Sequence, residues 1–292
     1  MAPKAGKMTK AHWKAFPYAD AVAYGYAGAT LKTHWSRLHR GDCEPYPETA
    51  GLKQLIGHCP QLEPAKQSID AAATTLQDAW RAYHSGDFAR AVELGVALGP
   101  MGYNVANKAT NIYATYLEKS DKAKLDLFLA SGQRAEQLAA AAATIPNAWY
   151  FYAQAIGRYS QGISVVKALA EGYGGKVKHA LERAIALEPR HADAHIALGA
   201  YHAEIINKIG ATIGGLTYGA SREAGVKHFE SALKLNPHSA IARIEYANGL
   251  VMMFGESMLA QATKLYEEAA GCPPADAMER LDAELAKSEL ED

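Results

Sequence analysis

Small and large apolar residues recur at fixed spacings between positions 148 and 274. Three segments there each end in a proline, and the residues before it follow the spacing four, three, five. The sets are Val177, Leu181, Ala184 and Pro189; Gly225, Phe229, Ala232 and Pro237; and Ala262, Tyr266, Ala269 and Pro274. Spacings of three and four place side chains on one helical face, and proline ends a helix because it lacks an N–H donor. The pattern predicts three successive helices.

An earlier helix precedes each of these three. Its marked positions have the spacing three, one, three: Trp149, Tyr152, Ala153 and Ile156; His195, Leu198, Gly199 and His202; Arg243, Tyr246, Ala247 and Leu250. Small residues beside large ones let two antiparallel helices approach closely. We therefore expect helix pairs and an all-α fold.

These combined patterns resemble the tetratricopeptide (TPR) repeat, a helix pair of about 34 residues with a closing proline. The resemblance implies an α-solenoid, whose usual use is to bind a peptide or protein on its concave face. The distance from the early to the late section is 28 positions from Trp149 to Val177 and 30 from His195 to Gly225, but 19 from Arg243 to Ala262. The first two pairs are therefore elongated by apolar, glycine-rich inserts, 164–175 and 208–221.

The rest of the chain predicts a single TPR-like domain over residues 1–292. Aromatic, amphipathic residues 11–60 are expected to form a helical cap over the end of the array. Residues 68–146 read as degenerate helix pairs, 147–274 as the three recognisable repeats, and 275–292 as a capping helix. The Arg-Gly-Asp at 40–42 is interpreted as a helix end followed by a turn, within a loop from Gly41 to Pro47.

Two interpretations of the inserts stay open. Each insert can lengthen its helices and pack on its neighbour, or the two can build a cavity or an oligomer surface. Gly210, Gly214, Gly215 and Gly219 allow sharp turns, whereas the apolar residues between them need a cover. The candidate partner- or ligand-binding residues are Trp149, Tyr152, Tyr159, Ile209, Ile213, Leu216 and Tyr218.

The run NAWYFYAQAIGRYSQ (147–161) and the apolar hairpin after it resemble a narrower family, the T-component proteins of TRAP transporters. This resemblance covers the C-terminal half. It implies an oligomeric accessory protein with a hydrophobic pore that contacts a solute-binding component. Members are typically exported lipoproteins, whereas this sequence shows no leader and no lipobox cysteine.

Composition limits the partners and the cellular location that we expect for this protein. The formal net charge is -1 and no basic run occurs, so nucleic acid is not expected as a partner. Three scattered cysteines form no disulfide framework, and the first 16 residues contain no apolar signal core. The most apolar window, 138–156, is interrupted by Pro146, Asn147 and Gln154. We expect a cytoplasmic protein without a membrane span.

Candidate chemistry is sparse. His191, His195 and His202 share one helical stripe and are weak metal candidates, but two of them occupy repeat positions that normally pack between helices, so we expect no metal. No phosphate-binding or nucleophile motif is present, so we expect neither a cofactor nor enzyme activity. The carboxylate clamp of some TPR proteins is not reproduced. The expected function is a scaffold or adaptor that binds a protein, a peptide or a second copy of itself; the alternative is an accessory protein of the TRAP type.

Overall fold

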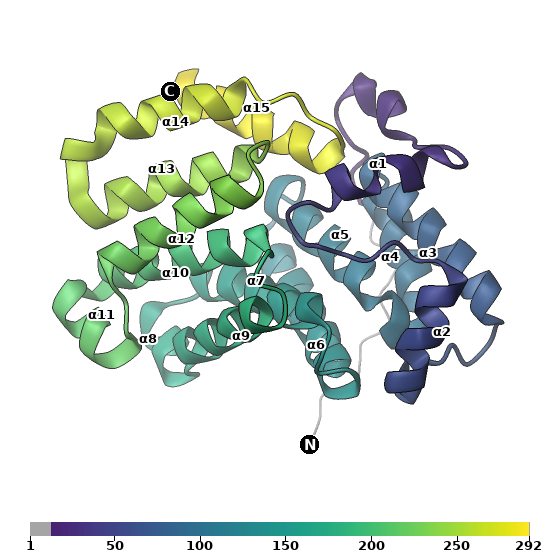
Figure 1. The fold of residues 1–292 in the computed structure, drawn as a ribbon. Helices are drawn as coiled ribbons and strands as arrows, with labels where there is room; N and C mark the ends of the chain where they lie inside the picture. The colour runs from purple at the N-terminus through teal and green to yellow at the C-terminus, as the bar shows by residue number, and fades with distance from the viewer. Residues whose placement is uncertain (1–12, 292) are drawn as a thin grey trace.

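The structure is a computed structural model that describes residues 13–291. Helices and loops make up this range, and it contains no strand, which confirms the predicted all-α class. Five helix pairs follow one another along the described chain, and the helices of each pair lie side by side (Figure 1). They are α3 (Ile69–His84) with α4 (Phe88–Ala97), α5 (Tyr103–Tyr116) with α6 (Asp121–Ala141), α7 (Pro146–Gln161) with α9 (Tyr173–Leu187), α10 (Ala192–Ile209) with α12 (Arg222–Leu235), and α13 (Ala240–Phe254) with α14 (Leu259–Ala270).

Each insert forms one short helix at the turn of its pair. Helix α8 (Val165–Ala170) lies between α7 and α9, and α11 (Ala211–Tyr218) lies between α10 and α12. Glycines in the left-handed region follow both short helices, Gly172 with φ +65° and Gly219 with φ +64°. A residue with a side chain is strained in that conformation, so glycine ends the helix and turns the chain into the next one.

Packing between pairs depends on small residues around Phe229. Its ring is fully buried between the backbones of α10 and α13, at Gly199 and Gly249. A Cβ atom added at Gly249 would lie 2.6 Å from the ring. The small and large residues of the repeat pattern thus meet in space, as the spacing predicted.

Four short 3-10 segments and three further helices complete the described chain. The 3-10 segments are η1 (Ala19–Tyr24), η2 (Pro60–Leu62), η3 (Gly99–Gly102) and η4 (Gly255–Met258), and the helices are α1 (Thr30–Leu38), α2 (Thr49–His58) and α15 (Ala277–Glu291). The first 12 residues, for which the sequence predicts no signal core and the start of the N-terminal cap, lie outside the described range. None of the helices in residues 13–291 is long and apolar enough to cross a membrane.

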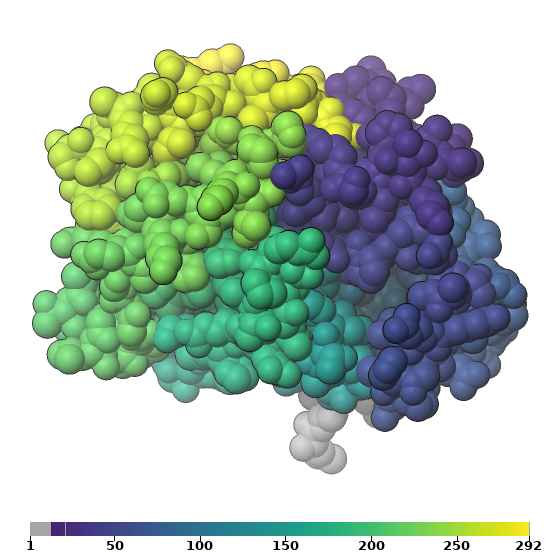
Figure 2. Space-filling model, viewed as in Figure 1, coloured from purple at the N-terminus to yellow at the C-terminus, as the bar shows by residue number. Residues whose placement is uncertain are grey.

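The N-terminal segment reaches the C-terminal helix. Arg37 forms two short contacts with Glu279, of 2.5 and 2.7 Å, and the Tyr26 hydroxyl donates to the Ala275 carbonyl. His84 of α3 contacts the buried Asp276 at 2.8 Å. Figure 2 shows the purple N-terminal segment against the yellow C-terminal helix. The array is therefore closed by contacts between residues more than 190 positions apart in the sequence.

Candidate functional site

Residues 39–47, between α1 and α2, lie along the first helices of successive pairs. The Gly41 carbonyl accepts from the Asp193 amide of α10 at 3.0 Å, and the Asp42 carbonyl accepts from the Asn147 side chain of α7 at 3.0 Å. In a TPR array these first helices line the concave face that receives a peptide. Here a segment of the same chain occupies part of that face, whereas the sequence pattern suggested only a cap over the end.

A buried ion pair holds this segment in place. Asp42 is 1% exposed, and its carboxylate accepts from Lys108 of α5 at 2.6 Å and contacts His39 at 2.9 Å. Burial alone would raise the pKa of Asp42, but the Lys108 charge and the His39 contact hold it well below its usual value. Burial lowers the pKa of His39 to about 4, so the imidazole is neutral near pH 7.

The next acidic residue behaves in the opposite way. Glu44 accepts from Asn147 at 2.6 Å and from Asn104 at 2.9 Å, but no cation contacts it in the described part of the chain. Burial, together with the nearby Asp42 charge, raises the pKa of Glu44 to about 7. The segment is therefore anchored by one ionised carboxylate and one that ionises only near neutral pH.

A cavity of about 230 Å³ lies beside this segment. Its walls come from the first helices α5, α7, α10 and α13, from α9 and α15, and from Leu38 and Gly41 of the N-terminal segment. Ile209 and Tyr218 of the second insert, with Val165 and Leu169 of α8, line its other side. The cavity thus extends from the N-terminal segment to the two inserts.

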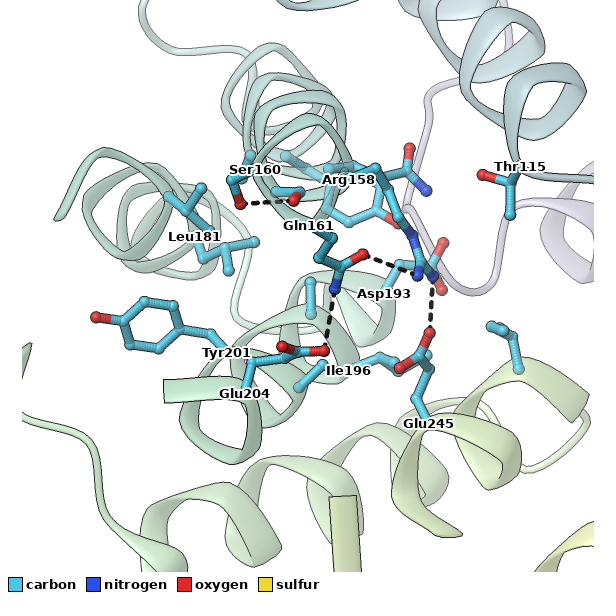
Figure 3. A pocket seen from close by; sticks show the side chains of 18 of the residues that line it. Thr115, Arg158, Ser160, Gln161, Leu181, Asp193, Ile196, Tyr201, Glu204 and Glu245 are labelled. Atoms are coloured by element: carbon cyan, nitrogen blue, oxygen red, sulfur yellow. Dashed lines mark hydrogen bonds and ion pairs between the residues drawn. The ribbon is translucent and has the colours of Figure 1, made fainter. Parts of the chain in front are cut away.

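Polar side chains meet inside this cavity (Figure 3). Arg158 of α7 contacts Glu245 of α13 at 2.7 Å, and Gln161 donates to Glu204 of α10 at 3.3 Å. The Coulomb attraction of Glu245 raises the pKa of Arg158, although burial opposes it. The cavity is therefore not purely apolar, and it offers hydrogen-bonding groups as well as aromatic rings.

The predicted binding residues separate into three groups. Ile209 and Tyr218 line the cavity. Trp149 and Tyr152 are half-buried and Tyr159 is buried, and all three pack in apolar clusters; the Trp149 ring donates to the Ala143 carbonyl at 2.9 Å. Ile213 and Leu216 point outward, with exposed fractions of 59% and 86%. The structure does not bring the seven residues together in one site.

The histidine stripe has local partners. The His191 ring accepts a hydrogen bond from the Ala194 amide at the start of α10 and contacts the Asn147 side chain at 2.8 Å. His195 contacts His228 at 2.9 Å, and His202 accepts from the Ser221 amide at 3.2 Å. Within residues 13–291, no group of three or more His, Cys, Asp or Glu side chains is placed to hold a metal ion. The spacing of four and seven reflects helix capping and packing here.

Exposed apolar residues gather on the two inserts. On α8 they are Val165, Val166 and Leu169, exposed by 44%, 78% and 45%; on α11 they are Ile213 and Leu216. Both helices lie at the turn end of adjacent pairs (Figure 1). We call these five residues the insert edge.

Sequence reasoning missed the polar residues of the interior. Asp42 and Lys108 are 66 positions apart, and Tyr116 and Asp282 are 166 apart. The one available signal was a charged residue, Lys108, within an expected helix of the degenerate pairs. Without partners identified in space, such a residue does not distinguish a buried pair from a surface charge.

Comparisons with known proteins give the fold. No protein-family model matches the chain, and no curated protein is significantly similar to it. Among solved structures, it is similar to a thermophilic TPR protein of Thermus thermophilus, with a TM-score of 0.53 and 17% sequence identity over 74% of this chain and 99% of that chain. The narrower likeness to TRAP T-components gains no support. The protein therefore has a TPR-like, all-α helical-repeat fold.

Proposed function

We propose that the protein is a non-catalytic scaffold that binds a protein partner through the insert edge. The carrying observation is the exposure of Val166, Ile213 and Leu216 on two neighbouring short helices. Large exposed apolar patches are uncommon on monomeric proteins and typically mark interaction surfaces. TPR-like arrays commonly bind protein partners, which agrees with this role.

The filled inner face supports the choice of this edge. A peptide that bound along α5, α7 and α10 would have to displace residues 39–47 and with them the buried Asp42–Lys108 pair. Removing one partner from such a pair leaves a buried charge uncompensated, at a cost of about 3–5 kcal/mol. The outward-facing inserts require no such rearrangement.

Site-specific photocrosslinking in the cells of origin tests the proposal. A photoreactive phenylalanine at Leu216 is expected to give a discrete covalent adduct, whereas the same residue at Val22, which is 90% exposed on η1, serves as the control. Ile213→Ser in the Leu216-labelled protein should reduce the adduct at least several-fold. An adduct with a second copy identifies self-association, and an adduct with another protein identifies an adaptor. Equal labelling from positions 216 and 22 would contradict the proposal.

A second function, ligand binding by an accessory protein, is favoured by the cavity. Ile209 and Tyr218 of the predicted ligand region line it, and its volume suits a small molecule. Pockets with a mostly apolar wall and a few convergent polar groups are the usual sites for such ligands. A calorimetric titration with six-carbon ligands tests this function separately from the insert edge.

A further inference from the structure

The charges that line the cavity do not balance. Three cationic side chains border it, namely Lys108, Arg158 and Lys208. Five carboxyl side chains border it as well, namely Asp193, Glu204, Glu245, Glu279 and Asp282. When all five carboxyl groups are ionised, this excess of acids gives the space a negative potential, because the low-dielectric walls screen charges poorly.

Each of these three cationic side chains already forms an ion pair with a carboxylate. Their described pairs are Lys108–Asp42 at 2.6 Å, Arg158–Glu245 at 2.7 Å and Lys208–Glu204 at 3.1 Å. Glu279 is paired with Arg37 at 2.5 Å, from outside the cavity. Two carboxyl groups, those of Asp193 and Asp282, are left without a cation among the described residues. An anionic ligand would find no free positive charge here.

Asp282 is the more deeply placed of the two. It is 2% exposed, and the Tyr116 hydroxyl donates to one of its oxygens. The structure describes no hydrogen bond to the other oxygen. Burial raises the pKa of Asp282 well above its usual value, since an ionised carboxylate is poorly solvated there.

Asp193 faces the same space from α10. The Asp193 backbone amide donates to the Gly41 carbonyl, but no hydrogen bond to the Asp193 carboxylate is described. Burial raises the pKa of Asp193 to about 7, although the Lys108 charge opposes this shift. A buried carboxyl group without donors is costly in its charged form, and a bound cation would remove that cost.

The opposite end of the cavity is apolar apart from Gln161 and the Glu204–Lys208 ion pair. Val165, Leu169 and Ile209 line it there, and the first two are nearly half exposed, so this end meets the surface at the insert edge. Tyr150 and Tyr201 also line the cavity. The faces of such rings attract organic cations.

We propose that the cavity binds a primary aliphatic amine, with its ammonium group at Asp282 and Asp193 and its hydrocarbon tail directed toward α8. The ammonium N–H groups donate to the Asp193 carboxylate and to the Asp282 oxygen that the Tyr116 hydroxyl does not contact. The tail replaces water along the apolar end, which is favourable at about 25 cal/mol per Å² of buried apolar surface. This inference rests on the second function above and names the class of its ligand.

Three ligands that share a six-carbon chain and differ in their head group test the inference. Hexylamine, hexan-1-ol and hexanoate are titrated into the wild-type protein by isothermal calorimetry. Hexylamine is expected to bind at least tenfold more tightly than hexanol, and hexanoate more weakly than both. Equal binding of hexanol and hexylamine would overturn the amine inference while leaving an apolar-ligand function in place. Absence of binding by all three would contradict both, and neither outcome affects the insert edge.

Two near-isosteric variants assign the head-group position. Asp282→Asn and Asp193→Asn are each expected to weaken hexylamine at least tenfold and to leave hexanol within about twofold. Glu230→Gln, an exposed change on α12 outside the cavity, serves as the matched control and should alter neither. Circular dichroism checks that each variant is folded. Folded variants that bind hexylamine like the wild type would overturn the assignment, and the wild-type series decides the amine inference even if a variant fails to fold.

Discussion

Asp42 and Glu44 are two positions apart, yet their environments shift their pKa values in opposite directions. Lys108 and His39 contact Asp42, which keeps the group ionised. Glu44 has amide donors only, and burial raises its pKa to about 7. The sequence predicted this stretch correctly as a turn in a loop. Its ionisation could not be predicted, because the partners belong to α5 and α7, from 60 to more than 100 positions away.

Replacing Glu44 by glutamine should change how stability depends on pH. The wild-type folded state holds the Glu44 proton up to about pH 7, whereas the unfolded state releases it near the ordinary value of 4.5. Wild-type stability therefore falls as the pH rises from about 4.5 to 7, because the folded state binds more protons there. We expect Glu44→Gln to gain stability relative to wild type across this window, by up to about 3 kcal/mol above pH 7.

Urea unfolding at pH 4.5, 6 and 8 measures this difference. Glu93→Gln, at an exposed surface pair with Arg90, is the control and should shift stability little at any pH. A difference between Glu44→Gln and wild type that stays constant with pH would refute the assigned pKa.

At the level of elements, the helix pairs follow the repeat pattern closely. Spacings of three and four place Phe229 and Gly199 on facing helices, and the structure joins them in one buried cluster. The inserts were identified by length and composition, and each contains one short helix. Whether they pack or project was open, because composition alone does not say what covers an apolar residue. Val166 and Leu216 project, whereas Tyr218 packs inward.

Gly249→Ala should destabilise the protein in spite of alanine's higher helix propensity. The added Cβ would lie 2.6 Å from the buried Phe229 ring, and overpacking of this kind costs about 1–3 kcal/mol. Alanine regains about 1 kcal/mol of helix propensity, so the expected net loss is up to about 2 kcal/mol. Gly157→Ala provides the matched control, since a Cβ there meets nothing within 4 Å and should stabilise α7. Thermal or urea unfolding compares the two, and a Gly249→Ala variant as stable as Gly157→Ala would exclude the tight contact.

At the scale of the whole molecule, the N-terminal segment of the described chain contacts its C-terminal segment. Residues before α2 contact α15 through Arg37–Glu279 and the loop before α15 through Tyr26–Ala275. Asp276 of that loop contacts α3, and Asp282 of α15 contacts α5. An open solenoid has contacts only between neighbouring repeats, so such a closure couples distant segments. It also encloses the cavity, whose walls include both ends of the chain.

Arg37→Leu should loosen this closure locally. It removes the two contacts to Glu279 and leaves that mostly buried carboxylate without its cation. We expect faster amide hydrogen exchange in residues 276–284 and in α1, with α6 unchanged, because exchange reports local opening. Arg90→Leu, which removes an exposed pair within α4, is the control. Identical exchange in α15 for the two variants would show that the ion pair does not hold the ends together.

The sequence by itself determined the helix pairs, their order and the places of the inserts, because these depend on residues within about 34 positions of one another. Helix periodicity, small residues and terminating prolines act over that range. Only the tertiary structure decided that residues 39–47 occupy the inner face, that α15 meets α1, and that Asp193 and Asp282 share one cavity. These arrangements join segments roughly 90 to 240 positions apart, and no repeat spacing encodes them.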